Sequence, residues 1–194
     1  MAGPLYLIPI EPNRTLLELF ADASGSLGYG IFCMGHWLAD PWPPELRDQS
    51  IQWQELYPIA LACFLSGHQW SGKKLLFHCD NQAAVDIWAS GTYQDLLIMH
   101  LVRSIFFSTA TNHDTVLITH IVGTNNSIAD SLSRLQISWF CHLAPTADLH
   151  PTPVSASAVT LAHRLAFLQS QAIVDSTCCS YQAGICRYSP SAPP

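Results

Sequence analysis

The stretch His120-Ile-Val-Gly-Thr-Asn-Asn-Ser-Ile-Ala-Asp-Ser-Leu-Ser-Arg134 joins two sequence patterns within a few residues. It begins inside a β-branched run, 116–122, which predicts a strand. Gly123 and the polar residues after it predict a turn. The apolar residues that follow share one face of a helix: Ile128, Leu132 and Leu135. The stretch therefore predicts a strand, a turn and a helix, with Asp130 in the first turns of that helix.

Outward from this stretch, the chain alternates between strand and helix patterns in the order β-β-β-α-β-α-α-β-α. The predicted strands lie at 15–21, 28–33, 36–38, 74–79 and 116–122, and the predicted helices carry residues 53–64, 84–88, 97–108 and 128–135. A meander followed by alternating strands and helices is typical of a mixed sheet with helices on both faces. The sequence therefore predicts an α/β fold with a mixed five-stranded sheet flanked by helices, over residues 15–140.

Four acidic residues stand at informative places in this order. Asp22 ends the first predicted strand and Asp80 the fourth, whereas Glu55 and Asp130 lie early on helices. Because ligands of open α/β sheets bind where strand ends converge, the four carboxylates can meet at one edge. Taken singly, each has a simpler explanation as a turn residue, a helix cap or a favourable charge in a first helical turn.

A cluster of carboxylates is unfavourable unless cations neutralise it, because like charges raise one another's pKa. Oxygen ligands suit Mg²⁺ or Mn²⁺. Two such ions about 3.5–4 Å apart can activate a water molecule and stabilise the leaving oxygen of a phosphodiester. If the four acids converge, they predict a site for two divalent ions.

The composition fits a packed domain with little positive charge. Apolar residues make up 49% of the 194 residues, charged residues only 11%, and the net charge is −6 with eight Lys and Arg. This balance argues against a strongly basic nucleic-acid clamp. If the chain handles nucleic acid, metal ions or a neighbouring module must supply much of the positive charge.

The cysteines and the hydropathy pattern indicate an intracellular protein. The seven cysteines are odd in number and form no C-x-x-C pair, which favours a reduced protein; a zinc site built from scattered Cys and His is a weaker alternative. No apolar run reaches the length of a membrane span, and residues 1–12 lack the features of a signal peptide. The sequence does not distinguish cytoplasm from nucleus.

Four segments resemble the RNase H domains of retroelement reverse transcriptases: Phe20-Ala-Asp-Ala-Ser-Gly, Gln54-Glu-Leu-Tyr-Pro-Ile, Cys79-Asp-Asn-Gln-Ala-Ala-Val and the stretch from His120 to Arg134. The last is the most specific, since it follows the pattern H-x-x-G-x-x-N-x-x-A-D-x-L-S-R that closes that domain. The resemblance covers residues 15–136. The acid order Asp, Glu, Asp, Asp disfavours retroviral-type integrases, which share the fold but place Glu last.

The resemblance implies a metal-dependent endoribonuclease that cleaves the RNA strand of RNA–DNA hybrids. It implies that Asp22, Glu55 and Asp80 bind one metal and that Asp22 and Asp130 bind the other. It also implies fusion to a reverse transcriptase. The basic helix that some RNases H use to grip substrate has no counterpart between residues 88 and 97.

Three further residues resemble auxiliary positions of the family. His120, ten residues before Asp130, corresponds to a histidine thought to aid product release, or it simply ends a strand. Ser24 and Asn81 resemble residues near the sugars of the hybrid, and Asn81 is equally explained as a helix cap.

The two ends of the chain differ from the middle. Residues 1–14 are an N-terminal extension, residues 141–160 read as a linker rich in Pro, Ser and Thr, and residues 161–194 as an irregular or helical tail. The segment Val174–Tyr188 resembles the opening of the N-terminal domain of tyrosine recombinases, S-T-x-x-x-Y; the alternative is a disordered tail. An RNase H domain followed by a tyrosine recombinase is the layout of DIRS-type retrotransposons.

The recombinase-like segment departs from its family, because Cys178 and Cys179 stand where arginine is expected. No recombinase catalytic residue is present, which indicates a truncated or decayed copy.

Two interpretations of the whole chain follow. One is an active ribonuclease H module, which the four acids favour; the other is a catalytically inactive nucleic-acid-binding or connector domain, which the negative charge and the altered tail favour.

Overall fold

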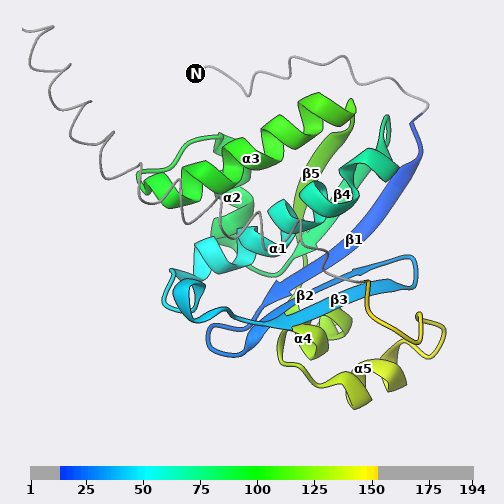
Figure 1. Ribbon diagram of the computed structural model, residues 1–194. Coiled ribbons are helices and arrows are strands. Elements are labelled where there is room, and N and C mark those ends of the chain that lie inside the picture. The colour runs from blue at the N-terminus through cyan, green and yellow to red at the C-terminus, as the bar shows by residue number, and fades with distance from the viewer. Residues whose placement is uncertain (1–13, 153–194) are drawn as a thin grey trace, which may run out of the picture.

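A computed structural model describes residues 14–152 of the chain. These residues form a five-stranded sheet in the order β3-β2-β1-β4-β5, with β1–β2–β3 antiparallel and β1–β4–β5 parallel (Figure 1). The strands are β1 Leu16–Ala23, β2 Gly28–Cys33, β3 His36–Pro41, β4 Lys74–Cys79 and β5 Thr115–His120. The helices are α1 Ile51–Ser66, α2 Gln82–Ser90, α3 Leu96–Asn112, α4 Ser127–Ser133 and α5 Ile137–Leu143, with short 3-10 turns at Pro44–Leu46, Gly67–Trp70 and Gly123–Asn125.

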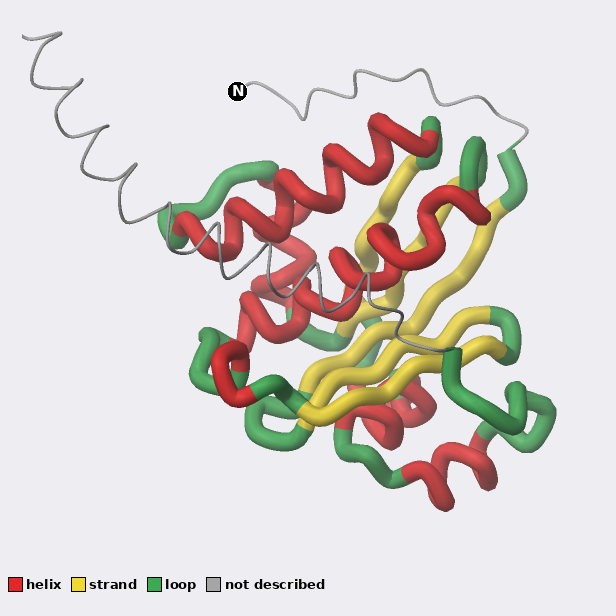
Figure 2. The backbone as a smooth tube through the Cα atoms, viewed as in Figure 1, coloured by secondary structure: helices red, strands yellow, loops and turns green. Residues whose placement is uncertain are grey.

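The main core lies between the sheet and the helices α1 and α3. Alternate residues of β1 and β4 are buried on this side, as the two-residue period of a strand requires. They are Leu17, Leu19 and Ala21 on β1, and Leu75, Phe77 and Cys79 on β4. Figure 2 shows α1 and α3 running side by side over this face of the sheet. The pattern fixes which way every β1 and β4 side chain points.

Helix α1 is buried along most of its length. Ser50 caps its first turn by accepting a hydrogen bond from the Trp53 backbone N–H. Every residue from Trp53 to Cys63 is buried, because α1 packs on β1 and β2 as well as on α3. Pro58 lies inside the helix rather than in its first turn. Glu55, on the same buried stretch, is thereby carried into the protein interior.

A second, smaller core covers the opposite face of the sheet, where α4 packs on β1, β2 and β3. Its buried residues are Trp37, Leu132, Phe140 and Ala144. The helix predicted to run through Leu135 ends earlier: α4 ends at Ser133, and Leu135 has a left-handed φ of 58°. The chain then forms α5, which the sequence patterns did not predict.

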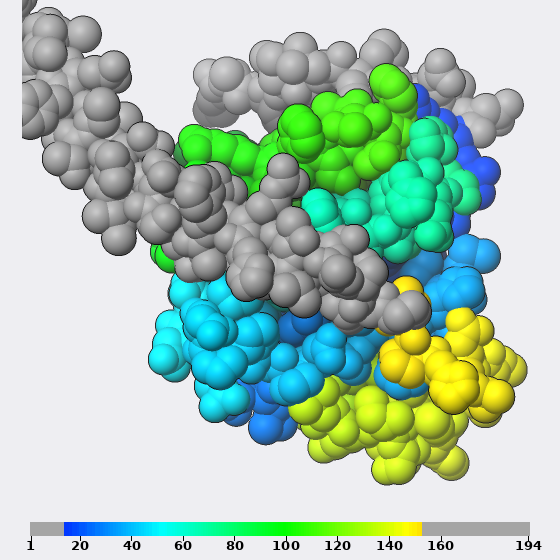
Figure 3. Space-filling model, in the orientation of Figure 1, coloured from blue at the N-terminus to red at the C-terminus, as the bar shows by residue number. Residues whose placement is uncertain are grey.

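The segment after α5 lies along β3. Asp148 donates its backbone N–H to Gly35 O at 2.9 Å, and Trp37 Nε1 donates to Asp148 O at 2.8 Å. Thr152 N donates to Trp37 O at 2.7 Å. In Figure 3 the yellow surface of this segment adjoins the blue surface of β2 and β3. The first part of the predicted linker, 141–152, therefore contacts the sheet; the rest of it, the tail 161–194 and the extension before residue 14 lie outside the described residues.

The element order and sheet topology confirm the predicted fold class. The chain has an RNase H-like α/β fold, in which a mixed five-stranded sheet carries α1 and α3 on one face and α4 on the other. The antiparallel meander β1–β2–β3 and the parallel neighbours β4 and β5 place the carboxyl ends of β1 and β4 at one edge.

Candidate active site

Three carboxylates meet where the parallel strands β1 and β4 end. Phe20 pairs with His78; Asp22 lies two residues after Phe20 near the end of β1, and Asp80 directly follows Cys79, the last residue of β4. Glu55 reaches the same place from α1. One carboxylate oxygen from each of Asp22, Glu55 and Asp80 lies within 4.8 Å of the others, an arrangement that can hold a metal ion. Within residues 14–152 no other group of three or more His, Cys, Asp or Glu side chains comes this close.

Glu55 is almost enclosed, with 5% of its surface exposed. Burial, together with the charges of Asp22 and Asp80, raises its pKa to about 9, against the weak opposing effect of a hydrogen bond from Cys79. That bond runs from Cys79 Sγ to Glu55 Oε2 at 3.7 Å. In the absence of a cation, Glu55 therefore carries a proton at neutral pH.

The residue before Glu55 ties α1 to the loops around the site. Gln54 Nε2 donates to Arg47 O at 2.8 Å and to Gly25 O at 3.2 Å. Trp53 stacks on Tyr57 one turn later, with ring centroids 5.2 Å apart. These contacts fix the first turns of α1, which is the part that carries Glu55.

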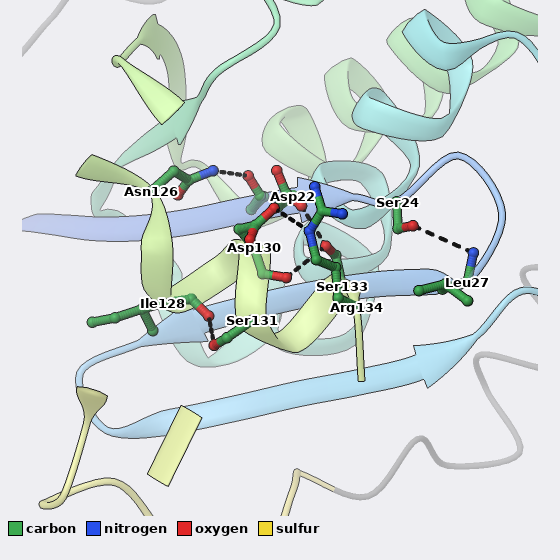
Figure 4. A network of polar contacts seen from close by, with 10 residues as sticks. Asp22, Ser24, Leu27, Asn126, Ile128, Asp130, Ser131, Ser133 and Arg134 are labelled. Atoms are coloured by element: carbon green, nitrogen blue, oxygen red, sulfur yellow. Dashed lines mark hydrogen bonds and ion pairs between the residues drawn. The ribbon is translucent and has the colours of Figure 1, made fainter. Parts of the chain in front are cut away.

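Asp22 is also buried, with 5% of its surface exposed. Burial raises its pKa to about 6; a hydrogen bond from Ser133 opposes this, and the charges of Asp80 and Asp130 add to it. Ser133 Oγ donates to Asp22 Oδ2 from the last residue of α4 (Figure 4). Asp22 is therefore hydrogen-bonded by a residue of α4, which covers the face of the sheet opposite to α1, the helix that carries Glu55.

The fourth predicted acid lies beside this cluster and outside the group of three. Asp130 is on α4 and is half-exposed; its Oδ1 accepts a 2.7 Å hydrogen bond from Arg134 Nε. Its charge nevertheless contributes to the raised pKa of Asp22, and the two side chains face each other in Figure 4. The structure therefore brings Asp130 to the edge of the sheet where the other three acids meet, but at the rim of the cluster and in an ion pair with Arg134.

Close packing brings α4 to this edge. Gly30 is the register partner of Asp22 in the β1–β2 pair. A Cβ at Gly30 would lie 2.4 Å from Leu132 Cβ and 2.9 Å from Ala129 O, so α4 approaches β2 more closely than any side chain would permit. Asn126 is fully buried, and its Nδ2 donates to Ala21 O at 3.1 Å. These two features hold α4 next to Asp22.

The turn between β5 and α4 closes over Asp80. A Cβ at Gly123 would lie 3.1 Å from Asp80 Oδ2, so the backbone passes very near this carboxylate. His120 ends β5, opposite Cys79 in the register, and is exposed. It therefore ends a strand and lies at the same edge of the sheet as the acids, and its auxiliary role in product release remains a prediction.

The two weaker predictions fall on turns beside the site. Asn81 Oδ1 accepts the Ala84 backbone N–H at 3.1 Å and caps α2, which confirms the cap interpretation of this residue. Ser24 Oγ accepts the Leu27 N–H at 3.4 Å in the β1–β2 turn (Figure 4). A contact of either residue with the sugars of a nucleic acid remains a prediction.

The sequence patterns did not predict a role in the site for two polar residues that shape it, Ser133 and Asn126. Both belong to the stretch from His120 to Arg134, so the signal was present in the motif. What the pattern did not reveal is their partners, because Ser133 lies 111 residues from Asp22 and Asn126 lies 105 residues from Ala21. Only the fold brings these pairs together.

No protein-family model and no curated protein sequence matches this chain. Several solved structures resemble it. LC11-RNase H1, isolated from compost, has a TM-score of 0.47 and 13% identity, covering 62% of this chain and 92% of that one. RNase H1 from the halophilic archaeon Halobacterium salinarum NRC-1 has a TM-score of 0.48 and 14% identity, covering 64% of this chain and 99% of that one. The foamy viral protease-reverse transcriptase, solved in complex with an RNA/DNA hybrid, has a TM-score of 0.43 and 15% identity, covering 68% of this chain and 21% of that one.

The four cysteines in the described part of the chain are free: Cys33, Cys63, Cys79 and Cys141. None of them joins a group of metal-ligating side chains within residues 14–152, so the zinc alternative has no support there. In the same range, no helix combines the length and apolar character needed to cross a membrane.

Proposed function

We propose that this chain hydrolyses the RNA strand of RNA–DNA hybrids, using two divalent metal ions held by its four acids. The observation that carries the proposal is the convergence of Asp22, Glu55 and Asp80 within 4.8 Å, with Asp130 beside them. The sequence motifs around these residues resemble those of retroelement RNase H domains, and the element order and sheet topology agree with that resemblance.

The donor set fits Mg²⁺ or Mn²⁺. It is built of carboxylate oxygens, which are the ligands these ions prefer. Buried like charges without a cation are unfavourable, and the raised pKa of Asp22 and of Glu55 is the expression of that cost. Asp22, Glu55 and Asp80 would hold one ion, and Asp22 and Asp130 the other. Bound there, the two ions would supply activation of the attacking water and stabilisation of the leaving oxygen.

The chain's own residues prepare this chemistry. Glu55 would release its proton when a cation binds, because burial and the neighbouring acids raise its pKa to about 9 and a bound cation favours the ionised form. Asp22, whose pKa burial raises to about 6, is already mostly ionised at neutral pH. The backbone turn at Gly123 lies close to Asp80 and limits its movement. Arg134, on the exposed side of Asp130, is a cation at the rim of the cluster, where a phosphate of the substrate strand would approach.

The proposed partners are an RNA–DNA hybrid and the modules to which such a domain is fused. We propose a reverse transcriptase before it and a tyrosine recombinase after it, as in DIRS-type retrotransposons, in an intracellular setting. With eight Lys and Arg in 194 residues, the chain itself neutralises few phosphates, so binding to the hybrid should depend on the divalent ions and on these neighbours.

A second candidate is an inactive nucleic-acid-binding or connector domain. Its support is the net charge of −6, together with the arginine-to-cysteine departures in the recombinase-like segment. The two candidates differ in turnover. The active candidate needs all four acids; the inactive one needs only the fold.

The test is cleavage of a labelled RNA–DNA hybrid by the full chain in Mg²⁺ or Mn²⁺, with Asp80→Asn as the matched inactive control. We expect the parent to release RNA fragments with 3′-hydroxyl ends and the variant to release none. A parent that binds the ions yet leaves the hybrid intact supports the second candidate.

A further inference from the structure

Ser133 is fully buried at the end of α4, and its hydroxyl has two oxygen atoms within reach. One is Asp22 Oδ2, and the other is the backbone carbonyl oxygen of Asp130 at 3.0 Å (Figure 4). A serine hydroxyl carries one hydrogen and so donates to one acceptor at a time. The carboxylate is the stronger acceptor once it is ionised, because charge-assisted hydrogen bonds are stronger than neutral ones.

The position of Ser133 is set independently of Asp22. The missing side chain at Gly30 allows α4 to lie against β2, and Asn126 attaches the start of the helix to Ala21 O. Both contacts act beside Asp22: Gly30 is its register partner and Ala21 its chain neighbour. The serine hydroxyl is therefore presented to the Asp22 carboxylate by a rigid helix.

We infer that Ser133 is a positioning residue for Asp22, which fixes the orientation of this carboxylate for divalent metal binding. The inference rests on the function proposed above and adds a residue to it. A hydrogen bond on Oδ2 restricts rotation of the carboxylate inside the cluster. Without the bond, a bound cation would have to order Asp22 itself, so its affinity would fall. Hydrogen-bond partners of metal ligands typically contribute about 10- to 100-fold to metal affinity or activity.

Ser131 provides a matched control on the same helix. It is 1% exposed, and its Oγ donates to Ile128 O at 2.6 Å, within its own helix. Ser131→Ala and Ser133→Ala each remove one buried hydroxyl from α4. Only the second removes a bond to an acid of the cluster, so a purely structural role for Ser133 would make the two variants behave alike.

The experiment measures Mn²⁺ binding to the full chain by calorimetry, without nucleic acid. We expect Ser133→Ala to bind Mn²⁺ about 10- to 100-fold more weakly than the parent. Ser131→Ala should bind as the parent does, and Ser133→Thr, which keeps the hydroxyl, should bind more tightly than Ser133→Ala. If Ser133→Ala does not fold, Ser133→Cys replaces it, since a thiol has similar shape but is a weak donor. In hybrid cleavage, the Ser133 variants lacking the hydroxyl should lower kcat more than they raise KM for the hybrid.

The outcomes separate this inference from the proposed function. Parental Mn²⁺ affinity in a folded Ser133→Ala or Ser133→Cys variant overturns the inference, and it leaves the function intact if the parent cleaves hybrid. Equal weakening by Ser131→Ala also overturns it, because the effect would then belong to the helix. A parent that neither binds Mn²⁺ nor cleaves hybrid overturns both.

Discussion

Arg134 Nε donates to Asp130 Oδ1 at 2.7 Å, one helical turn along α4, and this bond gives the fourth acid a cation of its own. Asp130 raises the pKa of Arg134 through the same hydrogen bond. The two side chains are half-exposed, at 51% for Arg134 and 39% for Asp130, so the pair can open without unfolding α4. A second metal ion would therefore compete with Arg134 for Asp130.

Replacing Arg134 with Gln should tighten divalent metal binding and weaken substrate binding. The acids lose a competing positive charge, whereas the phosphates of a hybrid lose a partner. Stability should change by less than about 1 kcal/mol, because exposed ion pairs contribute little. Calorimetry with Mn²⁺ and the KM for hybrid cleavage measure the two effects.

Arg103→Gln is the matched control for that substitution. Arg103 is an exposed arginine on α3, away from α4, and its loss should change neither Mn²⁺ affinity nor kcat. If Arg134→Gln binds Mn²⁺ more weakly than Arg103→Gln, Arg134 supports the acids instead of competing for them.

The metal-free protein should lose stability as the pH rises. Burial raises the pKa of Asp22 from 3.8 to about 6 and that of Glu55 from 4.5 to about 9 in the folded state. When the pKa of an acid is higher in the folded state than in the unfolded state, its proton stabilises the fold. This stabilisation is complete at pH values below the pKa of the unfolded state, and it disappears as the pH rises through the pKa of the folded state. The Asp22 contribution is lost between about pH 4 and 6, and the Glu55 contribution between about pH 4.5 and 9.

Thermal unfolding of the parent and of Glu55→Gln, both in EDTA, isolates the second contribution. The variant has no proton to lose, so it should gain stability relative to the parent from pH 6 to pH 9. Added Mn²⁺ should restore the parent at high pH more than it restores the variant. A constant difference between the two proteins over this range would show that Glu55 is not protonated in the folded state.

The sequence predicts some elements of this fold closely and does not predict others. The strand at Lys74–Cys79 was predicted with its observed ends, because a short apolar run lies between Gly72 on one side and Asp80-Asn81 on the other. The convergence of Asp22 and Asp80 was expected only if their strands were neighbours, and the parallel pairing of β1 and β4 supplies that condition. Helix α5 was missed because it is seven residues long and follows Leu135, whose left-handed backbone conformation no pattern signals.

The sequence also did not predict that Glu55 is buried. Glu55 lies off the apolar stripe of its helix, which is formed by Trp53, Leu56, Tyr57, Ala60 and Phe64, but α1 is enclosed on several sides by the sheet and α3. The contact between Ser133 and Asp22 depends on the close approach of α4 at Gly30. Such contacts arise from three-dimensional packing, so spacing along the chain does not predict them.

Asp114 offers a stability test away from the site. It is 1% exposed between α3 and β5, and neither carboxylate oxygen has a hydrogen-bond partner among the described residues. Burial raises its pKa to about 6, against the attraction of Arg14. Asp114→Asn should therefore stabilise the protein at pH 8 by on the order of 1 kcal/mol, after allowance for solvent screening, and by much less at pH 4.

Urea unfolding at the two pH values measures this gain, and hybrid cleavage by Asp114→Asn should equal that of the parent. Destabilisation at pH 8 would mean that the ionised carboxylate has a partner, such as Arg14, whose attraction outweighs the cost of burial.

The segment after α5 should contribute to stability. Asp148 and Thr152 bond the backbone of β3 and its preceding turn, and Asp148 Oδ2 lies 2.6 Å from His36 Nδ1. A chain ending at residue 143 should melt at a lower temperature than one ending at residue 152, because it leaves Trp37 Nε1 without its acceptor. Equal melting temperatures would show that these contacts add no stability.

We propose that the four acids are metal ligands rather than structural groups. Asp22→Asn, Glu55→Gln and Asp80→Asn should each remove most hybrid cleavage, and Asp130→Asn should be milder in Mn²⁺ than in Mg²⁺. Asp22→Asn, Glu55→Gln and Asp80→Asn each remove a carboxylate from the crowded group of three, so none of these variants should be less stable than the parent without metal. Asp130→Asn also loses the exposed ion pair with Arg134, so its stability should change by less than about 1 kcal/mol.

The most direct measurement sets metal-free melting temperature against hybrid cleavage for the parent and these four variants. We expect the parent to cleave hybrid and the four variants to lose most or part of this cleavage, while Asp22→Asn, Glu55→Gln and Asp80→Asn melt at or above the parental temperature in EDTA. Variants that melt well below the parent in EDTA would contradict this proposal, because the acids would then be structural caps and pairs.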